Sequence, residues 1–145
     1  MQIIIRQPQS SLEWNQYYEL RWQMLRQPWQ QPHGSEKDEL EDRSIHRLVI
    51  CDNQVVAVGR LHITDPDQAQ IRYMAVAKAY QQQGLGKLIL NSLEQAAHDK
   101  NIKQISLNAR ESAIQFYQSC HYQLAEQTHT LYNSIKHFRM HKSLT

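Results

Sequence analysis

The sequence predicts an α+β fold in α-β-α layers, in which about four helices flank a mixed, mostly antiparallel central sheet. Three observations favour this class. Between residues 47 and 76, β-branched runs alternate with turn residues, which indicates an antiparallel meander. An amphipathic pattern from residue 85 predicts a helix, and the strand after it should lie parallel to the strand before it. The chain has 145 residues and no linker rich in Pro, Gly or Ser, so we expect one domain over residues 1–145.

The composition argues against several classes of partner. The formal net charge is +2 and the two signs are mixed along the chain, so we expect no nucleic-acid binding. The N-terminal apolar run is too short for a signal peptide, and no later run reaches the roughly 20 apolar residues of a membrane span. We therefore expect a cytoplasmic protein with no membrane partner, either a monomer or a homodimer. Cys51 and Cys120 lie in no paired pattern, so we expect neither a disulfide framework nor a zinc site.

The first third of the chain predicts a strand, a helix and an acidic loop. Residues 2–6 form a β-rich run, typical of an edge or first strand. A dense apolar and aromatic stretch favours a helix over Leu12–Leu25, with Ser10 or Ser11 as N-cap and Pro28 just past its end. Residues 27–44 carry Pro, Gly and an acidic cluster, which predicts a loop. Within it, Ser35–Asp38 has the form of a capping box and favours one short helix.

The meander follows this loop. Arg47–Cys51 and Val55–Ile63 predict a hairpin, because turn residues separate them. Both runs are apolar at nearly every position, as expected for central strands that are covered on both faces. After a turn at Thr64–Asp67, alternation predicts a third strand over Ala69–Val76. That alternation places four side chains on one face: Ala69, Ile71, Tyr73 and Ala75.

The rest of the chain alternates between helical and strand patterns. From residue 85, apolar side chains recur at three- and four-residue steps and predict a helix of about four turns. A strand over Ile102–Ala109 and helical spacing over Ser112–Cys120 come next. Tyr122–Thr130 and Ile135–Lys142 indicate two more strands. His137 and His141 would suit a metal on a helix, but on a strand a zinc site is not expected.

Gln81–Lys87, with the sequence Gln-Gln-Gln-Gly-Leu-Gly-Lys, predicts an anion-binding turn between a strand and the amphipathic helix. Gly84 and Gly86 permit unusual backbone dihedrals and a close approach of a ligand. The first amides of the helix lack an intrahelical partner and favour negative charge, so a phosphate group fits there. The turn lacks the glycine spacing and hydroxyl of a P-loop, and it also lacks the third glycine and the acid of a Rossmann turn.

Gln81–Gly86 instead resembles the Gln/Arg-x-x-Gly-x-Gly/Ala pattern of the GNAT superfamily, the acetyl-coenzyme A-dependent N-acetyltransferases. The strand Gln70–Val76 before it, and Leu107–Arg110 with Ala113–Tyr117 after it, also resemble that family. The resemblance covers the chain from about residue 47 to 122 and is strongest to small, single-domain, bacterial-type members. It implies a sheet splayed into a V between its fourth and fifth strands, with acetyl-coenzyme A as cosubstrate in the gap and no metal.

The resemblance also implies which residues bind the cofactor. Backbone groups of the strand would pair with the pantetheine amides, amides of Gln82–Lys87 would hold the pyrophosphate, and Gln81 would close the turn. Asn108 would contact the cofactor near its sulfur, and Lys87 would neutralise a phosphate, although both residue types are also common at strand ends and helix surfaces. The expected cofactor-binding residues are Met74, Ala75, Val76, Gln81, Gln82, Gln83, Gly84, Leu85, Gly86, Lys87 and Asn108.

Acetyl transfer to an amine needs a neutral amine, a stabilised oxyanion and a proton for the departing thiolate. Tyr117 matches the family's helix tyrosine near the cofactor sulfur, so we expect it to be the general acid; the alternative is a core tyrosine packed beside its neighbour. The strand over residues 70–76 has no glutamate to serve as base. We expect water relayed to His62, which ends the neighbouring strand, with Glu126 and His137 as alternatives. The family's glycine after this helix is replaced by His121, which puts the left-handed helix stop in doubt.

The acceptor, an amine of a small molecule or a protein, should enter from the side of the first helix, the acidic loop and the last strands. The candidate residues there are Trp29, His33, Tyr132 and His137. The acidic loop would attract a cationic amine, although charged residues at a capped helix start usually form a solvated face. A second function stays open: a non-catalytic module that binds acyl-coenzyme A and regulates a partner.

Overall fold

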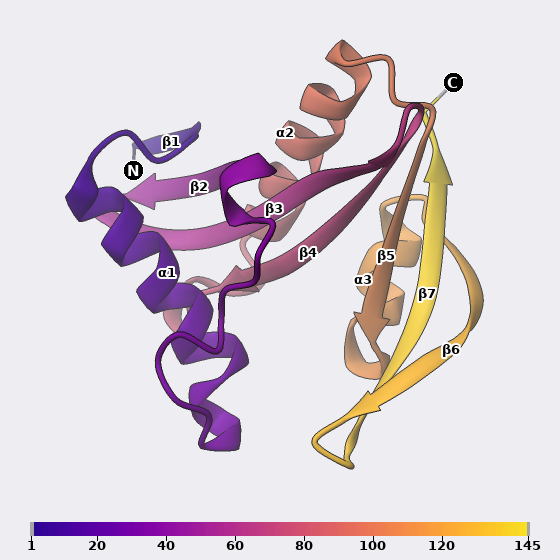
Figure 1. Cartoon of the computed structure of the whole chain (residues 1–145). Helices are drawn as coiled ribbons and strands as arrows, with labels where there is room; N and C mark the ends of the chain where they lie inside the picture. The colour runs from indigo at the N-terminus through magenta and orange to yellow at the C-terminus, as the bar shows by residue number, and fades with distance from the viewer. Residues whose placement is uncertain (1, 145) are drawn as a thin grey trace.

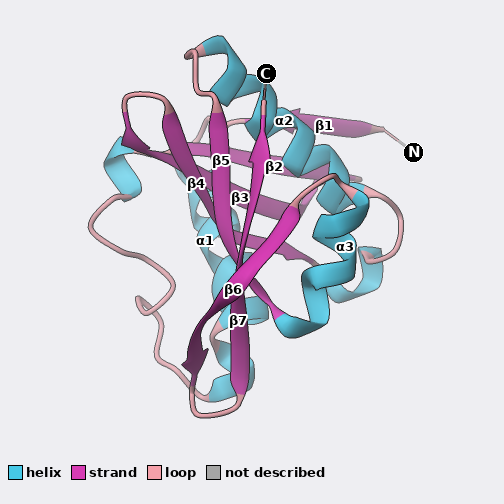
Figure 2. Ribbon diagram, turned by 90° about the vertical axis from the view of Figure 1, so that its right-hand side faces the viewer, coloured by secondary structure: helices cyan, strands magenta, loops and turns pink. Residues whose placement is uncertain are grey.

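Seven strands form one mixed sheet in the order β1-β2-β3-β4-β5-β7-β6 in the computed structural model, which describes residues 2–144 (Figures 1 and 2). The strands are β1 Ile3–Arg6, β2 Ile45–Cys51, β3 Gln54–Asp65, β4 Gln68–Val76, β5 Gln104–Arg110, β6 Gln123–Leu131 and β7 Ile135–Ser143. The α-helices of the described residues are α1 Ser11–Leu25, α2 Leu85–Asp99 and α3 Ile114–Ser119. The predicted α+β class, mostly antiparallel with one parallel pair, is confirmed.

The capping of α1 follows the sequence, whereas the loop after it does not. Ser10 is the N-cap, and its Oγ accepts a hydrogen bond from the Glu13 amide at 3.1 Å. The predicted helix at residues 35–38 is absent, because the Ser35 Oγ donates back to the Pro32 carbonyl instead of capping a helix. Two 3₁₀ turns, η1 Gln27–Trp29 and η2 Glu41–Arg43, stand in the loop instead. The described residues therefore form three α-helices rather than about four.

Two hydrophobic clusters cover the two faces of the sheet. On one face, Tyr17 and Leu20 of α1 pack against buried residues of β2, β3 and β4. On the other face, the apolar stripe of α2 packs on the same strands, and Tyr117 of α3 joins this cluster near β5. Figure 1 shows α1 and α2 on opposite sides of the sheet. The apolar sequences of β2 and β3 are thus explained, because both faces of these strands are covered.

A β-bulge at Tyr73 interrupts the alternation of β4. Arg60 pairs with Arg72 and Val58 pairs with Ala75, so one extra residue of β4 stands opposite β3, and Tyr73 has φ 61°. Ile71 therefore packs on the α2 face, whereas Ala75 packs on the α1 face. The predicted common face for Ile71, Tyr73 and Ala75 is wrong, because the extra residue shifts every following side chain to the opposite face.

The parallel pair of strands is short and then separates. β4 pairs with β5 only from Gln68 opposite Gln104 to Ile71 opposite Leu107. Beyond these residues the two strands diverge (Figure 1), and residues 72–76 have no strand partner on that side. We call this divergence the splay. It confirms the V between the fourth and fifth strands that the resemblance implied.

The end of α3 uses a histidine where glycine is more common. His121 has φ 73°, and the Tyr122 amide donates to the Tyr117 carbonyl at 3.0 Å, which completes a left-handed helix stop. The chain then enters β6, which pairs with β7 at the edge of the sheet. None of the helices within residues 2–144 combines the length and the apolar composition that a bilayer crossing needs.

Candidate active site

The turn between β4 and α2 is built to leave backbone amides free. Gln81 closes it as expected, because its Nε2 donates to the Val76 carbonyl at 3.1 Å. Gln82 and Gly84 have φ 62° and 82°, and no side chain caps α2. The first amides of this 15-residue helix therefore lack partners, and no atom lies within 4 Å of the place where a Cβ of Gly84 would stand. The turn offers uncapped donors and open space, which fits an anionic group.

The turn, the end of β4 and α3 meet at Gly86. A Cβ at this position would lie 3.3 Å from Phe116 Cζ and 3.7 Å from Val76 Cγ2, so glycine permits this close packing. The unpaired edge of β4 at the splay ends at the same place, with Met74, Ala75 and Val76. The structure thus brings the predicted pantetheine edge and the predicted pyrophosphate turn together. Lys87 is exposed beside them on α2.

Tyr117 lies in the core behind this turn. It is 8% exposed, and its ring contacts Phe116 and Tyr122 with centroid distances of 5.0 and 5.8 Å. Its hydroxyl makes no hydrogen bond to another residue within 2–144. Burial raises the pKa of the phenol, and the nearby charge of Arg110 opposes that effect only in part. Tyr117 therefore has the packing of a core residue and a hydroxyl that stays protonated at neutral pH.

The two candidate base histidines differ in the nitrogen that they leave free. His62 Nδ1 lies 3.4 Å from Arg60 Nη2, which can only donate, so neutral His62 carries its proton on Nε2. His137 Nδ1 lies 3.0 Å from the Ile135 carbonyl, which can only accept, so neutral His137 keeps a lone pair on Nε2. Burial lowers the pKa of both imidazoles, which favours the neutral rings.

The acceptor candidates separate into two groups. Trp29 of η1 stacks on Tyr132 of the β6–β7 turn, with ring centroids 5.7 Å apart. His137 stacks on His129 at 4.3 Å. His33 lies elsewhere, because its ring stacks on Trp22 at 3.5 Å and its Nε2 faces Glu19 on α1.

Strand register places Asn108 near His137. Asn108 is exposed on β5, opposite Arg139 of β7 and two residues before Arg110, which pairs with His137. Since side chains alternate along a strand, Asn108 and Arg110 share a face, and that face is opposite the one where Leu107 and Ala109 pack with α2 and α3. Asn108 and His137 therefore stand on one face of the β5–β7 pair.

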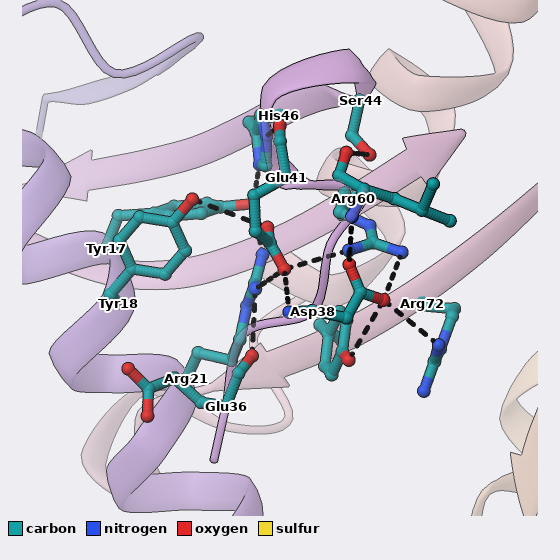
Figure 3. A network of polar contacts seen from close by, with 12 residues as sticks. Tyr17, Tyr18, Arg21, Glu36, Asp38, Glu41, Ser44, His46, Arg60 and Arg72 are labelled. Atoms are coloured by element: carbon teal, nitrogen blue, oxygen red, sulfur yellow. Dashed lines mark hydrogen bonds and ion pairs between the residues drawn. The ribbon is translucent and has the colours of Figure 1, made fainter. Parts of the chain in front are cut away.

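Buried ion pairs bind the acidic loop to the sheet (Figure 3). Arg60 Nη1 donates to Asp38 at 2.6 Å and to Glu41 at 2.9 Å, and Arg21 of α1 donates to Glu41 at 2.9 Å. The side chains of Arg21 and Arg60 are 0% exposed. Asp38 and Glu41 therefore neutralise buried cations; they are neither a solvated face nor free to attract a cationic amine.

Arginines also surround the bulge residue. The guanidinium carbons of Arg21, Arg72 and Arg60 lie 4.3, 4.7 and 4.8 Å from the centroid of the Tyr73 ring. Burial alone raises the pKa of Asp38, but hydrogen bonds from Arg60 and the Leu40 amide outweigh it and hold that pKa well below its ordinary value. The sequence held a signal of this network, since an arginine inside an apolar central strand needs a buried anion.

Within 2–144, no group of three or more His, Cys, Asp and Glu side chains is arranged to hold a metal ion.

Comparison with known protein families gives a match over most of the chain. The profile of the family described as the Acetyltransferase (GNAT) family matches residues 14–122. The chain is 32% identical over 111 residues to an uncharacterised N-acetyltransferase, YjcF, of Bacillus subtilis. The aligned residues cover 77% of this chain and 79% of that protein.

Solved structures show the same fold. An acetyltransferase from Bacillus subtilis in complex with coenzyme A superposes with a TM-score of 0.78 and 18% identity, over 99% of this chain and 100% of that one. An aminoglycoside 6'-N-acetyltransferase complexed with coenzyme A superposes with a TM-score of 0.82 and 13% identity, over 100% of this chain and 98% of that one. Both chains share the architecture described above.

Proposed function

The chain belongs to the GNAT acetyltransferase family, and on that premise we propose that it moves an acetyl group from acetyl-coenzyme A to a primary amine of a small molecule or a protein. One observation carries the proposal: the unpaired edge of β4 at the splay ends beside the uncapped N-terminus of α2. An extended amide-bearing chain that ends in a pyrophosphate needs both features side by side. The relatives that were solved with coenzyme A support this choice of cosubstrate.

The residues that would hold acetyl-coenzyme A are backbone groups for the most part. Met74, Ala75 and Val76 offer the free edge of β4, and residues 82–87 offer amides that no side chain caps. Gln81 keeps the turn attached to Val76. When bound, the cosubstrate supplies the activated acetyl group. An amide of the β4 edge would donate to the acyl oxygen and so stabilise the negative charge that develops there.

We assign the proton donor to Tyr117. Its raised pKa keeps the hydroxyl protonated over the physiological range, as a general acid requires. The hydroxyl has no hydrogen-bond partner within residues 2–144, so it is free to donate to a departing thiolate. Asn108 contributes a polar side chain on the neighbouring β5.

For the base, His62 and His137 are the candidates, each through a bridging water. We favour His137, because its hydrogen bond to the Ile135 carbonyl leaves Nε2 able to accept a proton. His62 becomes a base only after it releases Arg60. Trp29 and Tyr132, which stack near His137 at the end of the β6–β7 hairpin, are proposed to line the acceptor site.

Release of free thiol from acetyl-coenzyme A over a panel of amines tests this function. Release that depends on the added amine supports transfer. Tight binding of acetyl-coenzyme A without amine-dependent release supports the alternative, a non-catalytic sensor of acyl-coenzyme A.

A further inference from the structure

Arg110 is a half-buried cation that has no counter-ion among residues 2–144. It ends β5, where it pairs with His137 of β7. Within residues 2–144, no hydrogen bond or ion pair joins its guanidinium group to another side chain. A guanidinium group has five donors in a planar fork, so leaving all of them unpaired while half-buried is costly.

A second arginine faces the same region. Arg26 follows α1, and its guanidinium group donates to the carbonyls of Ser35 and Leu25 at 3.0 and 3.1 Å. These partners are neutral, and no carboxylate within residues 2–144 forms an ion pair with Arg26. Burial lowers the pKa of Arg110, and the nearby positive charge of Arg26 lowers it further.

Two acids of the loop after α1 are engaged elsewhere. Asp38 is held by Arg60 and Arg72, and Glu41 is held by Arg21 and Arg60. The deeply buried Arg21 and Arg60 are thus paired, whereas Arg26 and Arg110 have no ion-pair partner among residues 2–144. An anion from outside the chain would compensate both charges, and a guanidinium group suits such an anion because it binds in a bidentate way.

The position of the two arginines points to the acceptor. The charges of both also act on His137, and the charge of Arg110 is felt by Tyr117. The ring of Tyr132 lies close enough to influence Arg110 and stacks on Trp29, three residues after Arg26. Arg110 therefore stands opposite the proposed base, His137, and Arg26 precedes the η1 turn whose Trp29 stacks on Tyr132.

We propose that Arg26 and Arg110 bind a carboxylate group on the acceptor, so that the substrate is an amine that also carries a carboxylate. The inference rests on the proposed function, because it takes the acceptor to be an amine. A carboxylate matches the planar fork of a guanidinium group. The phosphates of the cosubstrate have their own site at the α2 turn, whereas Arg110 stands on the face of β5 opposite α2 and α3.

Matched pairs of amines test the proposal. L-amino acids and their C-terminal amides share the amine and differ in the carboxylate, and kcat/KM is measured for each pair with acetyl-coenzyme A. The expected preference for the acids is about 10- to 100-fold, as for one or two charge-assisted hydrogen bonds. Arg110→Met and Arg26→Met should each reduce this preference while KM for acetyl-coenzyme A stays unchanged. Arg43→Met, which removes an exposed arginine of η2, serves as the matched control and should keep the preference.

A binding measurement separates this inference from the proposed function. Calorimetric titration of N-acetyl amino acids and of N-acetyl amino acid amides, in the presence of coenzyme A, reports carboxylate recognition without turnover. Stronger binding of the acids that Arg110→Met abolishes upholds the inference even if no amine is acetylated. Equal binding and turnover of acids and amides, or a raised KM for acetyl-coenzyme A in both variants, overturns it.

Thermal unfolding excludes a merely structural role. Because the two cations repel one another, Arg110→Met should leave the midpoint temperature unchanged or raise it. A lower midpoint together with an unchanged acid preference would also overturn the proposal.

Discussion

Trp29 and Tyr132 stack with their rings 5.7 Å apart and inclined by 24°, although one follows α1 and the other lies in the β6–β7 turn. The contact joins the segments on the two sides of the splay, where strand pairing between β4 and β5 has already ended. The ring pair is thus a contact between the two halves of the sheet beyond the point where β4 and β5 stop pairing.

This stack should appear as a coupling energy. In a double-mutant cycle, Trp29→Ala and Tyr132→Ala are expected to interact by about 0.5–1.5 kcal/mol, because each variant removes the same ring contact. Urea unfolding of the two single variants and the double variant gives the value. Trp29→Ala combined with Tyr80→Ala, whose ring contacts neither residue of the pair, should be additive. Additivity of the first pair would show that the stack contributes nothing.

Tyr117→Phe should lower kcat and leave the fold intact. The substitution keeps the ring contacts with Phe116 and Tyr122 and removes only the hydroxyl. General acid catalysis typically contributes a factor of about 100 to 10,000, so the loss in kcat should fall in that range with little change in KM for acetyl-coenzyme A. Phe116→Leu, which changes a neighbouring ring without a hydroxyl, is the control. Full turnover by Tyr117→Phe would remove the residue from the mechanism.

The fall of kcat/KM at acidic pH, the acid limb of the pH profile, should result from protonation of His137. Burial lowers the pKa of its imidazole from 6.5, so the neutral, proton-accepting ring persists below that pH and kcat/KM should fall only at more acidic values. His137→Gln should abolish that limb and lower kcat/KM by about 100-fold. His62→Gln should keep both the limb and most of the rate. The opposite pattern would assign the base to His62.

Gly84→Ala should destabilise the turn through backbone strain and not through a steric clash. Gly84 has φ 82°, and a Cβ there would meet no atom within 4 Å, so the expected cost is about 1 kcal/mol of left-handed backbone strain. KM for acetyl-coenzyme A should rise as well. Gly34→Ala is the matched control, because Gly34 has φ 103° and equally open space in the loop after η1. It should lose similar stability without changing that KM.

Asp38→Asn should destabilise the protein and alter its acid unfolding. The pKa of Asp38 is depressed in the folded state, so its contribution is present above the ordinary carboxyl pKa of about 3.9 and is lost as the pH falls through the folded value. Removing the charge leaves the buried Arg60 without this partner, at a cost of about 3 kcal/mol near neutral pH. Glu39→Gln, an exposed acid of the same loop, should change little. Equal stability of wild type and Asp38→Asn at pH 7 would contradict this role.

Much of the fold could be predicted because its signals are local. Ser10 caps α1 through its own side chain, and Asp52 and Asn53 take φ 52° and 65° in the β2–β3 turn, as their residue types permit. The glycine turn could also be predicted, because its uncapped amides and positive φ angles depend only on residues that are neighbours in the sequence. The splay followed from the family resemblance and is confirmed by the short parallel pairing.

The missed features depend on contacts between distant parts of the chain. The bulge at Tyr73 lies opposite Gly59, where a Cβ would stand 2.5 Å from Ile89 Cγ2 and 2.7 Å from the Met74 sulfur. The ion pairs of Asp38 with Arg60 join a loop to a strand. An arginine in an apolar strand indicates a buried anion, but no local pattern identifies Asp38 as that anion. Arg110 lies in a segment that carries the family resemblance. Its lack of a counter-ion among residues 2–144 depends on the fold and could not be predicted from that resemblance.

The most direct test of the central claim is to measure acetylated amine and free thiol together, by mass spectrometry and a thiol reagent, in one reaction of wild-type protein with acetyl-coenzyme A and a reactive amine. Acetyl transfer predicts that the two products form in equal amounts and that neither forms without protein. Thiol release without acetylated amine would show thioester hydrolysis. Binding of acetyl-coenzyme A with neither product, over a broad panel of amines, would contradict the enzyme and favour the sensor.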